Sequence, residues 1–418
     1  MMAIDSNRLL AVSILIAGTM FVSATIAQTA DDGYRAFKNG EYHRAIEIFA
    51  PLARSGDAVS QFHLAEIYAD GLGTTRNTAE AMRLYESAAA KGYAPAQGRL
   101  GRMYLQGDRV DMDFERARTL LEAAAKKNDA TALGYLGTIY LDGLGVEADH
   151  QRAFDYLMEA AESDVPHAQS NLGRMYMLGY VVPRDIEKAN GWLEKAAQGG
   201  DINAGALLGR NLLFGRSGKK NEVRALRLLE RSAAAGSVLA EYTLGGAYHA
   251  GIGVEKNPTK AVKWYRSAAN KNFRYAQYQL AVMHWNGEGV IEDRGLAEHW
   301  YRQAAIQDVP EAQYALAYFS LVEKSVDRPL DVAVSLLNRA VDQRYEPALI
   351  LAGQLKIEGD VVPMDEIGGY ACILLAEIAA PESDIVQERK IYFGNKLTKY
   401  LIEQAATLAQ SGTCRIRL

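Results

Sequence analysis

The stretch AEYTLGGAYHAGIGVEKNPTKAVKWYRSAA, residues 240–269, contains the pattern that decides the fold. Ala240, Leu244 and Tyr248 are four residues apart, so they lie on one face of a helix. Two glycines then interrupt that helix, and Asn257 is a residue type that caps the start of the next one. The stretch therefore predicts two antiparallel helices joined by a short turn.

The same pattern recurs with a period of 36 residues. The central position of the first helix is occupied by Leu64, Leu100, Leu136, Leu172, Leu208, Leu244, Leu280, Leu316 and Ala352. Glycine or alanine follows each of these residues, which lets another helix approach closely. One helix pair cannot bury its own apolar face, so neighbouring copies must stack to form the core. An all-α solenoid with nine full copies is predicted.

The ends of the second helix in each copy are marked by residue types that suit them. Capping residues at its start are Asn77, Asp113, Asp149, Asp185, Asn221, Asn257, Asp293 and Asp365, and only Pro329 breaks this column. The position that ends each second helix is Gly56, Gly92, Asn128, Asp164, Gly200, Gly236, Asn272 and Asp308. Asn and Asp accept hydrogen bonds from free N–H groups, and Gly, Asn and Asp tolerate the left-handed conformation that closes a helix.

The loop YLDGLGVEAD, residues 140–149, resembles a glycine-rich phosphate loop when it is taken alone. In other copies the second glycine becomes Arg109, Val181, Ser217 or Val361, which a phosphate cradle would tolerate poorly. The loop is therefore interpreted as the hinge between the two helices of one repeat.

Composition excludes one broad class of function. The chain has 418 residues, a formal net charge of −5 and a pI of about 5.9. A general nucleic-acid binder needs a basic face to neutralise phosphates, so nucleic acid is not an expected partner.

The first 27 residues have the layout of a secretory signal peptide. Arg8 precedes a short apolar run from Leu9 to Val22, and small residues follow it. Export to the periplasm or the medium is the preferred interpretation, without stable membrane insertion after cleavage. An uncleaved anchor is the alternative. No later apolar stretch is long enough to span a bilayer.

The chain has two cysteines, Cys372 and Cys414. Export makes a disulfide between them plausible. The alternative is two unpaired thiols, one buried in a helix and one on a loose tail. Two cysteines alone cannot make a zinc site.

The repeats resemble the Sel-one-like repeat family, a relative of the tetratricopeptide repeats. The resemblance is carried by residues 240–269 and by the segments AQSNLGRMYMLG (168–179) and AQYQLAVMHWNGEGVIEDRGLAEHWYRQAA (276–305), and it extends over residues 31–380. It divides the chain into a signal peptide (1–27), a shortened first repeat (31–56), nine repeats (57–380) and a C-terminal helical cap and tail (381–418).

The resemblance implies a right-handed solenoid of about ten helix pairs whose concave face is lined by first helices. It also implies an adaptor that binds other proteins. Exported bacterial members are linked to envelope signalling, polysaccharide secretion and host interaction. The fifth copy has a basic loop, and the eighth loses both loop glycines and gains Pro329. A bend, a weaker interface or a partner contact is expected at these two copies.

The family geometry places the concave stripe two residues before and two residues after the central leucine. Candidate partner-binding residues on or near this stripe are Arg102, Arg174, Arg210, Tyr242, Tyr278, Tyr314, Tyr318 and Trp285. Tyrosine and arginine are enriched at binding hot spots, and arginine pairs with carboxylates. The competing explanation is that the tyrosines are ordinary repeat residues and the arginines pair with neighbouring acids.

No catalytic constellation is recognisable in the sequence. The histidines lack the spacing of a helical metal pair, and no serine lies in a nucleophile motif. The preferred function is a non-enzymatic periplasmic or secreted scaffold that binds a protein partner and needs no cofactor or metal. Two alternatives are a carbohydrate-binding module that uses the tyrosine-rich face and an enzyme acting on peptidoglycan or a β-lactam.

Overall fold

The computed structural model describes residues 29–215, 220–324 and 328–418. All regular secondary structure in these residues is α-helical, as the sequence predicts. The chain divides into two compact units, with the boundary between Gly199 and Gly200. The predicted signal peptide, residues 1–27, lies outside the described part of the chain.

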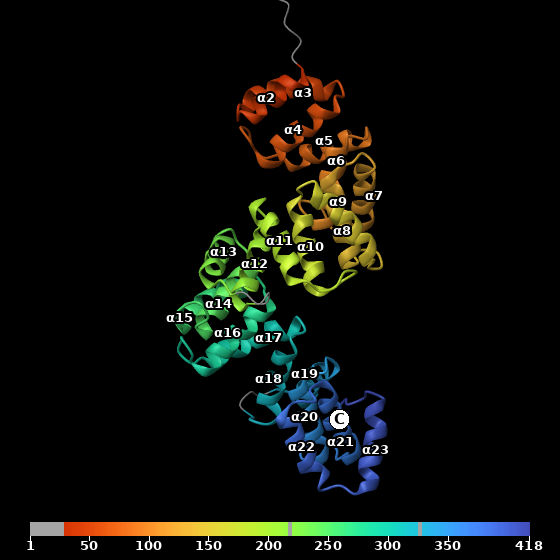
Figure 1. The fold of residues 1–418 in the computed structure, drawn as a ribbon, viewed down its shortest axis with the longest axis vertical. Helices are drawn as coiled ribbons and strands as arrows, with labels where there is room; N and C mark the ends of the chain where they lie inside the picture. Colours follow the sequence, from red (N-terminus) through yellow and green to blue (C-terminus); the bar gives the residue numbers. More distant parts are fainter. Residues whose placement is uncertain (1–28, 216–219, 325–327) are drawn as a thin grey trace, which may run out of the picture. The chain divides into compact units, whose positions relative to one another are not determined.

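The first unit is a succession of helix pairs (Figure 1). Its helices are α2 (Ala30–Lys38), α3 (Tyr42–Arg54), α4 (Ala58–Asp70), α5 (Thr78–Ala90), α6 (Ala94–Gln106), α7 (Phe114–Ala125), α8 (Ala130–Asp142), α9 (His150–Glu162), α10 (Pro166–Leu178) and α11 (Ile186–Gln198). From α4 onward, the even-numbered helices are the first helices of the repeats and the odd-numbered helices are the second.

The second unit continues the same alternation and ends with two additional helices. Its helices are α12 (Ile202–Phe214), α13 (Glu222–Ala234), α14 (Val238–Ala250), α15 (Pro258–Asn270), α16 (Arg274–Asn286), α17 (Arg294–Ile306), α18 (Pro310–Leu321), α19 (Leu330–Asp342), α20 (Glu346–Glu358), α21 (Glu366–Ala379), α22 (Asp384–Gly394) and α23 (Lys399–Gln410). Both α22 and α23 pack against α21. The C-terminal cap thus contains two helices.

Small residues allow the two helices of each repeat to approach closely. A Cβ atom added to Gly137 would lie 2.5 Å from Cγ of Leu157, and one added to Gly173 would lie 2.7 Å from Cγ of Leu193. Both leucines are fully buried on the second helix. The glycine after the central leucine therefore leaves the space that the second-helix leucine fills, which confirms the close approach expected from the sequence.

The predicted caps are present in the structure. Each Asn or Asp of the capping column accepts a hydrogen bond from a first-turn N–H, whereas Pro329 makes no side-chain cap. All of the predicted residues that end second helices have positive φ. In the hinge of residues 140–149, Gly143 and Gly145 have φ values of 66° and 68°. The loop is a turn between two capped helices, as predicted.

In two copies that lack the second glycine, the hinge position still has a left-handed conformation, whereas Val361 has no positive φ. Arg109 has a φ of 68° and Val181 a φ of 63°. Stacking of the helix pairs therefore imposes the turn on side chains that disfavour it.

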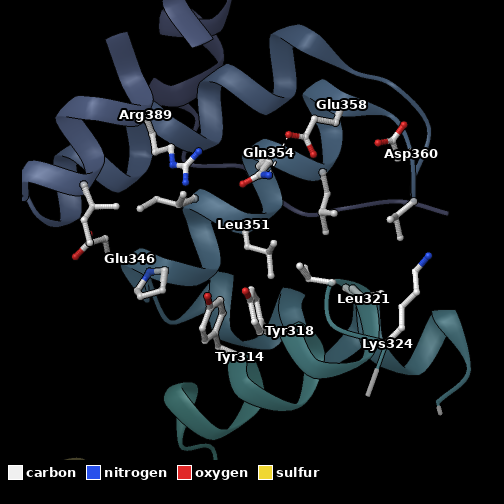
Figure 2. A pocket seen from close by; sticks show the side chains of 16 residues that line it. Tyr314, Tyr318, Leu321, Lys324, Glu346, Leu351, Gln354, Glu358, Asp360 and Arg389 are labelled. Atoms are coloured by element: carbon white, nitrogen blue, oxygen red, sulfur yellow. Dashed lines mark hydrogen bonds between the residues drawn. The ribbon is translucent and has the colours of Figure 1, made fainter. Parts of the chain in front are cut away.

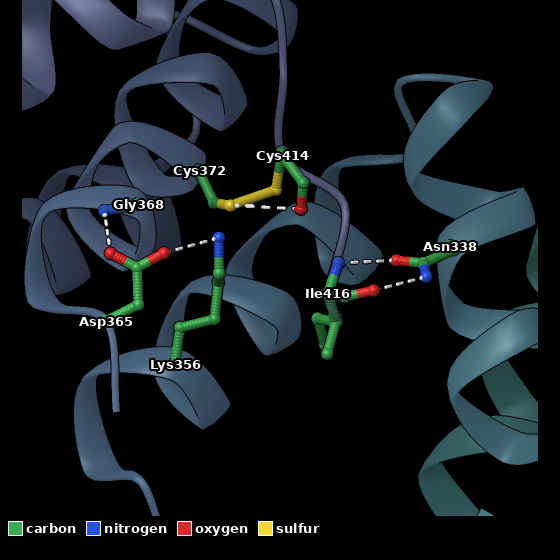
Figure 3. The surroundings of a disulfide bond; sticks show 7 residues. All are labelled: Asn338, Lys356, Asp365, Gly368, Cys372, Cys414 and Ile416. Carbon is green, nitrogen blue, oxygen red and sulfur yellow. Dashed lines mark hydrogen bonds and ion pairs between the residues drawn. A yellow bond between two sulfur atoms is a disulfide. The ribbon is translucent and has the colours of Figure 1, made fainter. Parts of the chain in front are cut away.

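The C-terminal tail is attached to two repeats (Figure 3). A disulfide joins Cys372 in α21 to Cys414 in the tail, over a sequence separation of 42 residues. The side chain of Asn338 in α19 accepts a hydrogen bond from the N–H of Ile416 at 2.8 Å and donates one to its carbonyl at 2.9 Å. Cys414 and Ile416 are buried, so the structure gives the tail a fixed position rather than a loose one.

Candidate functional site

Each unit carries a groove along its first helices, and the two stripe columns contribute to both grooves. The groove in the first unit, called the unit-1 groove, has a volume of about 310 Å³ and is lined by residues of α4, α6 and α8. Phe62 and Gly98 come from the column before the central leucine, and Glu66 and Arg102 come from the column after it. The two columns of the expected stripe therefore meet in one groove in the first two copies.

Arg99, Arg102 and Tyr135 line the unit-1 groove, and His167 stacks on Tyr135. Arg102 lies beside the hydroxyl of Tyr135 and partly offsets the rise in the Tyr135 pKa that burial causes. The ring of His167 stacks on Tyr135 with centroids 4.2 Å apart. Burial lowers the pKa of His167 to about 4, with a smaller contribution from the charge of Arg102 and against a backbone hydrogen bond with Gly134 that raises it. His167 is therefore neutral at pH 7, and Arg99 and Arg102 supply the positive charge of the groove.

The other two candidate arginines make contacts within their own units. Arg174 donates to Asn171 at 2.9 Å and pairs with Asp142 at 3.2 Å. Arg210 is half-buried in α12, and its charge acts on Tyr242 of the next first helix. Arg174 is engaged as the competing explanation anticipated, so a partner carboxylate would have to displace Asp142.

The tyrosines of the column before the leucine pack their rings into aromatic clusters. Tyr242 contacts Tyr265 at 5.8 Å between ring centroids, and Tyr278 contacts Tyr301 at 5.9 Å. Burial raises the pKa of Tyr242 and of Tyr278. Both side chains are half-buried beside these tilted neighbours, so only part of each ring is open to a ligand.

A second regularity explains where the aromatic residues occur. Phe62 packs on Tyr93 at 5.5 Å, Tyr242 packs on Phe273 at 5.2 Å, and Tyr314 packs on Tyr345 at 5.6 Å. The second residue of each pair occupies the N-cap of the next first helix and makes no side-chain cap there. Where that N-cap is Asp129, the facing residue is Gly98. In these three copies an aromatic residue of the column packs on an aromatic N-cap, whereas Gly98 faces a polar one.

The ring of Trp285 makes one stacking contact and one cation–π contact. Its ring stacks on Phe319 with centroids 3.6 Å apart and an interplanar angle of 10°. The guanidinium of Arg294 lies 4.7 Å from its ring centroid. The tryptophan joins the seventh and eighth copies through Phe319 of the following first helix, so both of these neighbours already contact its ring.

The groove in the second unit, called the unit-2 groove, is the larger of the two (Figure 2). It has a volume of about 590 Å³ and lies between α18, α20 and α22. Tyr314 and Tyr318 line it, so two of the predicted partner-binding residues meet here. The eighth copy, where a contact is expected from its unusual sequence, supplies α18.

Charged groups lie at both ends of the unit-2 groove. Figure 2 shows Glu346 and Arg389 at one end and Glu358 and Asp360 at the other. Lys324 also lines the groove beside the second end. Glu346 accepts a hydrogen bond from Ser383 at 2.6 Å. Ser383 is the N-cap of α22, so this bond joins the start of the cap helix to the start of α20.

The described residues contain no group of three or more histidine, cysteine or acidic side chains that could hold a metal ion. Among the described helices, none combines the length and apolar character needed to cross a lipid bilayer. The residues that line both grooves offer charged groups, hydrogen-bonding groups and apolar surface.

A glutamine that recurs at one position of the repeat and is buried was not predicted to have a structural role. The side chains of Gln61, Gln169 and Gln313 donate to carbonyls eight residues earlier at 3.0 to 3.1 Å. Glu241 occupies this column in the sixth copy and pairs with Lys271 at 2.8 Å. The recurrence of glutamine every 36 residues is visible in the sequence and could have indicated this role. Each glutamine joins the first helix of one copy to the end of the preceding helix.

Stacked antiparallel helix pairs with an open groove define an α-solenoid repeat protein. Eight successive segments match the model of the Sel1 repeat, namely residues 58–93, 94–129, 130–165, 166–201, 204–237, 238–273, 274–309 and 310–345. The chain belongs to the Sel1 repeat family. The ninth copy in the sequence pattern is not among the matched segments, although α20 and α21 form a helix pair in the same register.

Solved and curated proteins of this kind are similar to the chain. A Sel1 repeat protein from Oxalobacter formigenes is 30% identical, with a TM-score of 0.50, over 73% of this chain and 88% of that one. The protective antigen c5321 of uropathogenic Escherichia coli is 26% identical, with a TM-score of 0.42, over 88% and 94%. The exopolysaccharide production negative regulator of Rhizobium leguminosarum bv. viciae is 40% identical over 53 residues, or 13% of this chain and 20% of that protein. This chain therefore matches only a fifth of that relative.

Proposed function

We propose that this protein is an exported, non-enzymatic scaffold that binds a protein partner along its first helices. The proposal rests on the two grooves. Both are lined by the positions two residues before and two residues after the central leucine, which differ from copy to copy. Repeat proteins commonly use such surfaces for binding, since the core columns specify the fold and leave the inner columns free.

The packing of the tyrosines favours a protein partner over a carbohydrate. A sugar-binding platform needs exposed ring faces, but Tyr242 and Tyr278 are half-buried and lie against the tilted rings of Tyr265 and Tyr301. The unit-2 groove offers hydroxyl groups, charged side chains and apolar surface instead. These groups suit the mixed chemistry of a polypeptide.

A role in envelope regulation is the form of scaffold that we favour. The Rhizobium relative is named as a negative regulator of exopolysaccharide production, and its match to this chain supports a regulatory partner. Export is supported by the signal-like pattern in residues 1–27 and by the disulfide between Cys372 and Cys414. Disulfides persist in oxidising compartments and are rare in the cytosol.

Site-specific crosslinking in intact cells tests this function. A photoreactive phenylalanine analogue replaces Tyr314 in the unit-2 groove or Arg102 in the unit-1 groove, and mass spectrometry identifies what is attached. Arg227, exposed on the second helix α13, is the control position. We expect one protein to be captured from a groove position and not from Arg227. Capture of glycan alone, or equal capture at all three positions, would contradict the proposal.

Cell fractionation tests the location separately. The intact chain is expected in the periplasmic or secreted fraction, and a variant lacking residues 2–27 in the cytosol. Recovery of the intact chain from the cytosol would contradict export without affecting the proposal of a protein scaffold.

A further inference from the structure

We propose that the unit-2 groove binds an extended peptide segment of the partner that has an apolar side chain at its centre, a carboxylate at one end and a cation at the other. This inference rests on the proposed scaffold function and makes it specific. The recognition elements are the apolar floor between α18 and α20, the guanidinium of Arg389, and the carboxylates of Glu358 and Asp360.

The middle of the groove is apolar. Leu321 comes from α18, and Leu351 and Leu355 come from α20; all three line the groove while belonging to the buried core. Ile385 of α22 also lines it and is 60% exposed. An apolar side chain that covered Ile385 and this floor would be removed from water, which favours binding by about 25 cal/mol per Å² of surface buried.

Arg389 supplies the cation at one end, where it lies beside the carboxylate of Glu346, which accepts a hydrogen bond from Ser383. The arginine is half-buried on α22, and within the described residues no hydrogen bond or ion pair engages its guanidinium. Figure 2 shows that this group points toward the groove from above α20. A guanidinium binds a carboxylate through two parallel hydrogen bonds, so a partner carboxylate suits this end better than a neutral group.

Glu358 and Asp360 supply negative charge at the other end. Both are exposed, and Glu358 accepts a hydrogen bond from the neutral amide of Gln354 at 3.0 Å. No ion pair neutralises either carboxylate among the residues that the structure describes, and the nearby Lys324 leaves this end with a net negative charge. A lysine or arginine of the partner is therefore the expected contact.

The length of α20 sets the length of the occupant. Glu346 and Glu358 are the first and last residues of this helix, so the two ends of the groove are about 18 Å apart at 1.5 Å per residue. An extended chain covers about 3.3 Å per residue, and five or six residues span that distance. Tyr314 and Tyr318 line the same side of the groove, and their hydroxyls can bond backbone carbonyls along such a segment.

The closing experiment uses a displayed library of six-residue peptides with a fixed central leucine. The full chain is the target, beside an Arg389→Glu variant, a Glu358→Lys variant and the control Arg227→Glu. We expect the unaltered chain and the control to select an acid toward one end and a base toward the other. Arg389→Glu should exchange the preferred acid for a base, and Glu358→Lys should exchange the preferred base for an acid.

Affinities of the selected peptides complete the test. A peptide selected by the unaltered chain should bind Arg389→Glu at least tenfold more weakly, the usual size for loss of a charge-assisted hydrogen bond. Selection without a charge pattern, or selection that Arg389→Glu leaves unchanged, would overturn the inference. If no peptide is selected while crosslinking from Arg102 still captures a protein, the groove assignment fails and the scaffold function stands.

Discussion

The disulfide between Cys372 and Cys414 should decide the stability of the C-terminal cap. It closes a loop with a sequence separation of 42 residues. Closing a loop of that length removes about 13 cal/mol/K of entropy from the unfolded chain, which corresponds to about 4 kcal/mol at 25 °C. The Cys372→Ala/Cys414→Ala variant and the reduced natural chain should both lose stability of this order.

The loss should be local, because each repeat of a solenoid contacts only its neighbours. In amide hydrogen exchange, α21, α22 and α23 should lose protection while α4 to α8 keep theirs. Asn338→Ala, which removes two hydrogen bonds to the tail but leaves the disulfide, should cost less, about 1 to 3 kcal/mol. Unchanged protection of α23 in both the alanine variant and the reduced chain would refute the reasoning.

Three further predictions concern single side chains. Val181→Gly should raise the free energy of unfolding measured in urea by up to about 1 kcal/mol, because relief of the left-handed cost exceeds the entropy lost by glycine; a lower urea midpoint would count against this. Lys271→Ala should lower the free energy of unfolding, measured by thermal denaturation, by about 3 kcal/mol, because Glu241 stays buried without its cation. The matched control Lys127→Ala loses only a contact with a carbonyl and should lower it by about 1 kcal/mol. The free energy of unfolding should fall by up to about 3 kcal/mol from pH 6.5 to pH 4, since only the unfolded state protonates His167 in that range; His167→Phe should remove this part of the pH dependence.

Most of the fold could be predicted because its determinants are local and repeated. The cap at Asp149 and the hinge at Gly143 are each specified within a few residues, and repetition in other copies separates them from chance. The same repetition identified the phosphate-loop resemblance of residues 140–149 as a turn. The left-handed Val181 was the less expected outcome, since its conformation is imposed by helix stacking against the preference of its own side chain.

The candidate site was predicted only in part. The stripe columns do line both grooves, and Tyr314 and Tyr318 meet in one of them. The exposure of the tyrosine rings could not be predicted, because it depends on the cap residue of the next copy, as the contact of Tyr242 with Phe273 shows. Arg174 is likewise paired with an acid from the preceding repeat.

The sequence by itself determined the repeat, the helix pairs and their ends, because a 36-residue period records which face of each helix is buried. The tertiary structure alone decided the chemistry of the unit-2 groove. Arg389 and Ile385 belong to the cap, outside the repeating columns, and they reach the groove because α22 packs against α21 and is joined to Glu346 by its N-cap Ser383. Periodicity is informative about positions that every copy shares, whereas this site is formed by residues that occur once and meet only through packing.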